Sequence, residues 1–160
     1  MRGDFLRRFW EPVVRRLLHL YWRLARGLTV GVRGLVIDAQ GRVFLVKHSY
    51  VAGWHLPGGG VEVGETLAAA LARELREEAN IELRGPPALF AVYLNRRISR
   101  RDHVALYVVR SFEQSVPPQP NREIVAHGFF APGSLPQDTT RGTRERIAEV
   151  LAKRIVAEFW

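Results

Sequence analysis

The chain has 160 residues, of which 47% are hydrophobic and 25% charged, so it is long enough for one domain with a sizeable core and is not a disordered polypeptide. It contains no cysteine, which excludes a disulfide framework, a thiol nucleophile, an iron–sulfur cluster and a cysteine zinc site. Of the net charge of +8, residues 1–26 contribute +5 through seven arginines against Asp4 and Glu11, which leaves only +3 for the rest. Because the basic excess is concentrated in one segment, we do not expect a nucleic-acid-binding domain.

The first predicted element is an amphipathic helix over residues 12–26. Pro12 suits a first helical position, Gly27 suits the stop, and apolar residues recur at helical spacing with the arginines mostly opposite. The stripe consists of Leu6, Phe9, Trp10, Val13, Leu17, Leu20, Tyr21 and Leu24. Arginines interrupt every apolar run before it reaches the roughly 18 residues of a membrane span, and no secretory cleavage pattern is present.

The apolar stripe of this helix needs a partner, and three alternatives are open. We expect it to pack on the rest of the chain or on a second copy in a homodimer, and contact with an anionic membrane surface is the third alternative. The predicted organisation is therefore a basic helix over 1–27 and a main domain over 28–160. We expect a cytoplasmic protein, membrane-peripheral if the helix binds lipid.

Strands and helices alternate along the main domain. Val- and Ile-rich runs at 29–38 and 42–48, joined by the turn residues Ala39, Gln40 and Gly41, predict a hairpin. A glycine-rich loop at 53–60 precedes a helix that ends at Ala79, with Thr66 as its N-cap. Further strands are predicted at 88–94, 104–112 and 123–130, and a final helix at 143–158. This order predicts an α/β domain with a mixed sheet and helices on its faces.

Three glutamates are crowded on the predicted helix 67–79. Glu74, Glu77 and Glu78 fall at positions i, i+3 and i+4, so they share one face. They repel one another, and the negative end of the helix dipole increases the repulsion. If a divalent cation such as Mg²⁺ or Mn²⁺ bound there, the clustered carboxylates and the negative end of the helix dipole would both stabilise it. The alternative is a solvated acidic face that Arg73 and Arg76 partly neutralise.

The residues around these glutamates favour the metal site. From Gly59 the sequence runs through Glu65 to Arg73-Glu74-Leu75-Arg76-Glu77-Glu78-Ala79-Asn80-Ile81, which resembles the Nudix hydrolase signature Gly-x5-Glu-x7-Arg-Glu-U-x-Glu-Glu-x-Gly-U, where U is apolar. Eight of the nine specified positions match. The exception is Asn80 in place of glycine, a conservative change because Asn tolerates the left-handed conformation best among the other residues. The upstream Trp54-His55-Leu56-Pro57-Gly58-Gly59 is also similar to that family.

This resemblance implies a Nudix-type α/β/α sandwich and hydrolysis of a pyrophosphate bond, in a nucleoside diphosphate derivative or a nucleoside triphosphate, by water attack at phosphorus with Mg²⁺ or Mn²⁺. The small-molecule nucleotide is then the partner of the chain. By the same resemblance Glu77 and Glu78 are metal ligands, helped by a backbone carbonyl of Gly58 or Gly59, and Glu74 is a ligand or the base. Arg73 would steer the glutamates, and Glu65 would support the site.

Further candidates lie outside the signature. Glu123 is a candidate for a further metal ligand or base, with an exposed loop glutamate as the alternative. Arg33, Arg96 and Arg97 are candidates for gripping substrate phosphates, although a solvated turn is the alternative for the last two. Tyr50 and Trp54 are candidates for stacking on a base, although such aromatics more often pack in a core.

Two other functions remain open from the sequence. The first is a non-catalytic module that senses a nucleotide on the same fold, which the presence of all three glutamates disfavours. The second is an RNA 5′-end pyrophosphohydrolase, in which the basic helix would grip phosphates and binding would fall steeply with salt.

Overall fold

Two three-stranded sheets form the centre of the domain in a computed structural model, which describes residues 14–18, 20–22, 25, 27–120 and 122–160. In the first sheet β6 (Asp102–Val109) lies between β1 (Thr29–Val36), which runs parallel to it, and β5 (Ala88–Leu94), which runs antiparallel. In the second, β2 (Val43–His48) pairs antiparallel with β3 (Trp54–His55) and with β8 (Ile124–Phe130). The short strands β4 (Glu82–Leu83) and β7 (Phe112–Glu113) pair separately.

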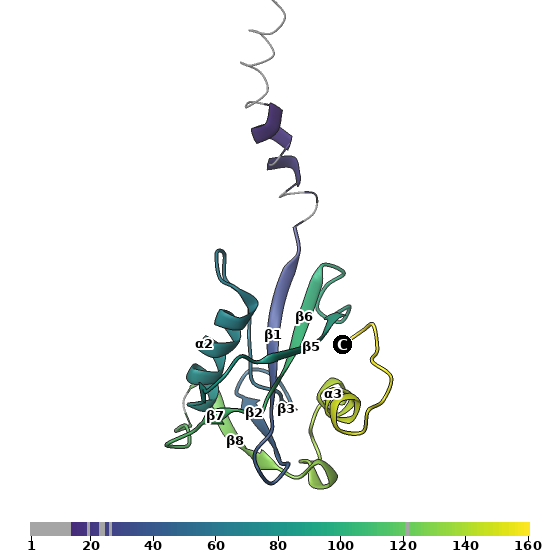
Figure 1. Cartoon of the computed structure of the whole chain (residues 1–160). Helices are drawn as coiled ribbons and strands as arrows, with labels where there is room; N and C mark the ends of the chain where they lie inside the picture. Colours follow the sequence, from purple (N-terminus) through teal and green to yellow (C-terminus); the bar gives the residue numbers. More distant parts are fainter. Residues whose placement is uncertain (1–13, 19, 23–24, 26, 121) are drawn as a thin grey trace, which may run out of the picture.

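Two helices cover opposite sides of these sheets (Figure 1). Helix α2 (Leu67–Ala79) buries Leu71 and Leu75 against Val32 and Val36 of β1, and helix α3 (Arg141–Leu151) packs on the other side. Alternation along the strands places Leu35, Val43, Leu45 and Leu106 in the core on the α3 side, which Ile147 of α3 completes. The predicted α/β/α sandwich with a mixed sheet is confirmed. A single turn of 3₁₀ helix, η1 (Pro132–Ser134), follows β8.

Helix α2 begins and ends as its sequence predicts. The Thr66 hydroxyl accepts a hydrogen bond from the Ala69 N–H, which caps the first turn. Asn80 adopts the left-handed conformation with φ of 54°, and its N–H donates to the Arg76 carbonyl at 3.1 Å. Asn80 therefore performs the backbone role of the glycine in the signature.

Three predicted elements differ from the structure. The hairpin is wrong, because only an isolated bridge between Ile37 and Val43 joins strands that then belong to different sheets. The strand predicted at 104–112 is divided into β6 and β7, and β4 was not predicted. The final helix ends at Leu151, because the segment after it turns back over α3 through Lys153 with a positive φ of 51°. Helical periodicity up to residue 158 was therefore fortuitous.

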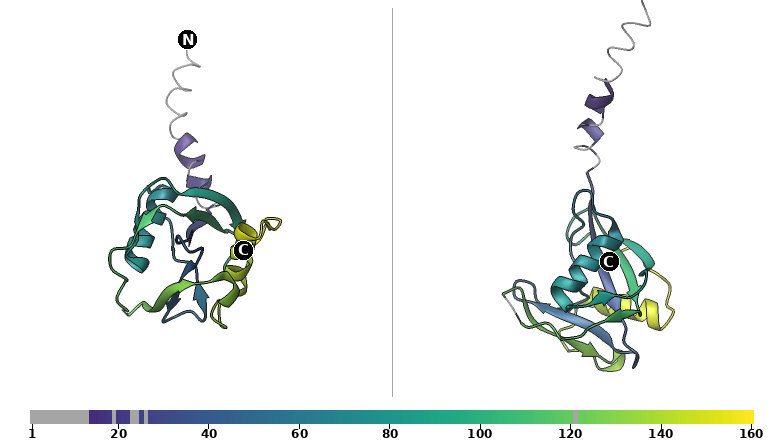
Figure 2. Two further views of the ribbon diagram at one scale, coloured as in Figure 1. Left: turned by 60° about the horizontal axis from the view of Figure 1, so that its bottom comes forward. Right: turned by 60° about the vertical axis from the view of Figure 1, so that its left-hand side comes forward.

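The described residues of the first helix, 14–18, 20–22 and 25, are helical and exposed. They stand away from the domain (Figures 1 and 2), so the prediction that this part of the helix packs on the rest of the chain is wrong. The remaining residues of the predicted helix lie outside the described residues. Among the residues that the structure describes, no helix has the length and apolar content that crossing a membrane demands.

Candidate active site

An acidic pocket of about 280 Å³ lies where the glycine-rich loop meets α2. Its walls come from β1, the end of β2 and the residues after it, β3, the glycine-rich loop, α2, and the residue before β8. The lining residues are Arg33, His48, Tyr50, Val51, His55, Gly58, Gly59, Gly60, Glu74, Glu78 and Glu123. Seven of the residues that the sequence predicts at a site therefore line this pocket: Arg33, Tyr50, Gly58, Gly59, Glu74, Glu78 and Glu123.

The glycine-rich loop is held against β1 by backbone hydrogen bonds. The Val32 N–H donates to the Gly59 carbonyl, and the Gly34 N–H donates to the Pro57 carbonyl, both at 2.9 Å. A Cβ on Gly59 would lie 2.6 Å from Cδ and 2.7 Å from Oε2 of Glu74, which is closer than such atoms approach. Glycine at this position therefore lets the Glu74 carboxylate touch the loop backbone.

Arg73 fixes Glu74 and ties α2 to the loop. Its Nη1 donates to Glu74 Oε1 at 2.7 Å, and its Nε and Nη2 donate to the two carboxylate oxygens of Glu65 at 3.1 and 3.0 Å. Its Nη2 also donates to the Gly60 carbonyl at 3.0 Å. These hydrogen bonds raise the pKa of Arg73 and lower the pKa of Glu65. Arg73 and Glu65 thus lie behind the pocket and orient Glu74.

Glu78 is the buried carboxylate of the site. It is 7% exposed, and its Oε2 accepts a hydrogen bond from the Gly58 N–H at 2.8 Å. Burial raises its pKa to about 7, and the nearby carboxylates of Glu74 and Glu123 act in the same direction. Glu77, by contrast, is 59% exposed and does not line the pocket; its carboxylate lies 3.6 Å from Arg73.

His48 joins this site, although no motif in the sequence predicts it there. Potential ligand atoms of His48, Glu78 and Glu123 lie within 4.8 Å of one another. Within the described part of the chain, the buried Nδ1 of His48 has no hydrogen-bond partner. The signal in the sequence was its position, because His48 continues the inward alternation of Phe44 and Val46 on β2. Burial lowers the pKa of His48.

A tyrosine and an arginine complete the pocket. The Tyr50 hydroxyl donates to Glu123 Oε1 at 2.9 Å, and burial together with this hydrogen bond raises the pKa of Tyr50 to about 12. Arg33 donates through Nη1 to the carbonyls of Leu56 and Gly58 at 2.9 and 2.5 Å. Burial lowers its pKa, although the charges of Glu78 and Glu74 oppose that effect. Arg33 therefore holds the loop and places a positive charge among the carboxylates.

The structure places three of the expected substrate contacts elsewhere. Trp54 packs edge-on against Phe130 with ring centroids 5.0 Å apart, as part of the core on the α3 side. Arg96 and Arg97 lie in the connection between β5 and β6 and do not line the acidic pocket. The guanidinium of Arg96 lies 4.9 Å from the centre of the Phe159 ring.

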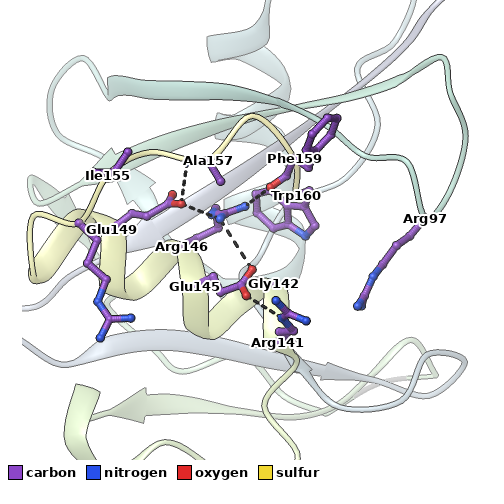
Figure 3. A pocket seen from close by; sticks show the side chains of 11 residues that line it. Arg97, Arg141, Gly142, Glu145, Arg146, Glu149, Ile155, Ala157, Phe159 and Trp160 are labelled. Carbon is purple, nitrogen blue, oxygen red and sulfur yellow. Dashed lines mark hydrogen bonds and ion pairs between the residues drawn. The ribbon is translucent and has the colours of Figure 1, made fainter.

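Arg97 instead lines a second cavity, of about 450 Å³, between α3 and the segment 152–160 (Figure 3). Arg146 is 1% exposed beneath it and forms an ion pair with Glu149 at 2.7 Å. Tyr93 donates to the other Glu149 oxygen at 2.7 Å, and Arg146 donates to the Phe159 carbonyl at 2.9 Å. The acidic groups here are already paired with cations, so this network fastens the segment 152–160 to α3.

Comparison with known proteins identifies this arrangement. A family model, described as NUDIX domain, matches residues 27–151. The chain therefore belongs to the Nudix family and is a Nudix-type hydrolase. It is 31% identical to a MutT-like protein of Streptomyces ambofaciens over 80% of this chain and 75% of that protein. It is also 33% identical to the human 8-oxo-dGDP phosphatase NUDT18, over 46% of this chain and 27% of that protein.

Solved structures agree with the fold. The crystal structure of a MutT Nudix hydrolase from Burkholderia pseudomallei is similar with a TM-score of 0.65 and 29% identity, over 76% of this chain and 97% of that chain. A Nudix hydrolase from Nitrosomonas europaea is similar with a TM-score of 0.62 and 26% identity, over 79% of this chain and 72% of that chain.

Proposed function

We propose that the acidic pocket hydrolyses the pyrophosphate bond of a nucleoside diphosphate derivative or nucleoside triphosphate, with Mg²⁺ or Mn²⁺ bound to its carboxylates. The observation that carries this proposal is the burial of Glu78 beside Glu74 and Glu123. A buried carboxylate whose pKa is raised by burial and by neighbouring carboxylates is costly for the fold alone, and a divalent cation relieves that cost.

The donor set fits a divalent cation. Glu78 and Glu123 offer carboxylate oxygens, and His48 offers an imidazole nitrogen, with the three ligand atoms within 4.8 Å. Carboxylates suit Mg²⁺, and Mn²⁺ also accepts imidazole. Glu74 and the carbonyls of the loop glycines, Gly58 and Gly59, complete the pocket residues that would hold the ion. Glu77 would join them only by turning from its exposed position beside Arg73. When bound, the ion would act as a Lewis acid that neutralises charge on the pyrophosphate oxygens.

The protein's own groups would position and deprotonate the water. Arg73 occupies Glu74 Oε1, and among the described residues no hydrogen bond is donated to Oε2, so that oxygen is available to receive the proton. Arg33 would add positive charge where the phosphate groups bind, since it already lies among the carboxylates. The roles of ligand and base are both compatible with Glu74, and kinetics must separate them.

The relatives leave the nucleotide open. The MutT-like protein is matched over most of its length, whereas the chain spans only about a quarter of NUDT18 and 35% of an RNA pyrophosphohydrolase of Hydrogenovibrio crunogenus. We therefore propose a small nucleotide as substrate and treat triphosphorylated RNA as the competing case. The small size of the pocket, about 280 Å³, favours the former.

The test is a panel of nucleoside di- and triphosphates, nucleotide sugars, dinucleotides and triphosphorylated RNA, assayed with Mg²⁺, with Mn²⁺ and with chelator. Glu78→Gln should lower turnover at least about a hundredfold, because a ligand worth several kcal/mol is lost. Glu158→Gln makes the same change at an exposed position outside the pocket and should have no effect. Metal-independent turnover, or normal turnover by Glu78→Gln, would contradict the proposal.

A further inference from the structure

The helix that precedes β1 presents an apolar face to solvent. Val14, Leu17, Leu18 and Tyr21 are 48%, 61%, 51% and 65% exposed. At about 100° per residue these four, together with Ala25, fall within an arc of about 100°. The exposed Leu20 and Trp22 widen the apolar arc to about 200°. Arg15 and Arg16 lie in the remainder, so apolar and basic residues occupy different sides of the same helix.

A second basic surface lies at the same end of the domain. The Thr29 N–H donates to the Arg101 carbonyl at 3.0 Å, and Thr29 pairs with Asp102. The connection between β5 and β6 therefore lies beside the point where the helix joins β1 (Figure 1). This connection exposes Ile98, which is 76% exposed, and four arginines: Arg96, Arg97, Arg100 and Arg101.

From these two surfaces we infer that the helix and the β5–β6 connection bind the surface of a lipid bilayer that contains anionic lipids. An amphipathic helix lies in such an interface with its apolar face among the acyl chains and its arginines at the headgroup phosphates. Guanidinium groups bind phosphates as bidentate donors. The same surface gives the arginines of the connection a function away from the acidic pocket.

Charge decides between a membrane and a second copy of the chain. Residues 1–26 carry a net charge of +5, so two such helices packed together would repel each other. An anionic bilayer attracts the same charge and also accepts the apolar face. The helix and the connection lie at the same end of the domain, so an anionic surface at that end would attract both. A bilayer is such a surface, whereas a dimer through the helix alone leaves the connection without a partner.

The test is flotation of the whole protein with vesicles of phosphatidylcholine alone or mixed with phosphatidylserine, at low and high salt. We expect binding to the anionic vesicles at low salt that weakens at least about tenfold at high salt or without phosphatidylserine. Leu17→Asp, on the helix, and the pair Arg100→Ser and Arg101→Ser, on the connection, should each weaken binding. Val116→Asp places the same acid at an exposed site elsewhere and should leave binding unchanged.

Melting temperatures verify that each variant is folded. Flotation measures binding alone, so the test does not depend on hydrolysis. The inference is overturned if wild-type protein fails to float with anionic vesicles at low salt. It is also overturned if Leu17→Asp floats as well as the wild type, or if neutral vesicles bind as strongly as anionic ones. A dimer in sedimentation that Leu17→Asp dissociates, without any vesicle binding, would assign the face to a second copy.

Discussion

Gly59 is the residue at which the glycine-rich loop touches Glu74, and replacing it by alanine perturbs the site without removing a charged group. The new Cβ would lie 2.6 Å from Glu74 Cδ, whereas ordinary contacts begin near 3.4 Å. The Glu74 carboxylate is the end of a flexible side chain, so it would retreat by roughly 1 Å rather than displace the backbone. It would then leave its hydrogen-bonding position on Arg73, now 2.7 Å away.

A misplacement of this size lowers kcat/KM by roughly a hundredfold, which is about 2.7 kcal/mol of transition-state stabilisation. The free energy of unfolding should fall by only about 1 kcal/mol, because a movable side chain relieves the overlap. Gly58→Ala provides a contrast: φ is +136° there and the new Cβ would overlap the Val32 carbonyl, which is backbone, so that variant should lose stability first.

The assay is steady-state hydrolysis with Mg²⁺, paired with urea unfolding of each variant. Gly133→Ala is the matched control, because a Cβ there meets no atom within 4 Å and the residue lies in η1, outside the pocket. Normal kcat/KM in folded Gly59→Ala would refute the reasoning, as would an equal loss in Gly133→Ala.

The remaining predictions concern stability. The pKa of Glu78 is about 7 in the folded protein and 4.5 in the unfolded chain, so in chelator the wild type loses stability as pH rises from 4.5 to 7. Above pH 7, Glu78→Gln should be more stable than the wild type by about 3 kcal/mol. Mg²⁺ should stabilise the wild type but not this variant. Parallel pH profiles would exclude this linkage. Arg146→Ala should cost about 3–5 kcal/mol in urea, because it leaves Glu149 buried and uncompensated. Gly34→Ala should lower the free energy of unfolding by about 1–3 kcal/mol, since its Cβ would lie 3.1 Å from Leu75 Cδ2. For either variant, a urea midpoint equal to that of the wild type would disprove the prediction.

Features that depend on neighbours along the chain could be predicted without the structure. Three glutamates one turn apart on a helix share a face whatever surrounds them, and Thr66 and Asn80 cap that helix through local hydrogen bonds. The spacing from Gly59 to Ile81 identified the family for the same reason, since it describes one loop and one helix. The local structure at these positions could therefore be predicted without knowing which distant segments contact them.

Which of these groups meet depends on how distant segments pack in the folded protein. It buried Glu78 and left Glu77 exposed, and it brought His48 from β2 and Glu123 from before β8 to the same pocket. It also paired β1 with β6 instead of β2, although the hairpin pattern was locally plausible. Strand pairing and burial depend on packing between segments far apart in sequence, and hydrophobic periodicity carries no information about which distant segment is the partner.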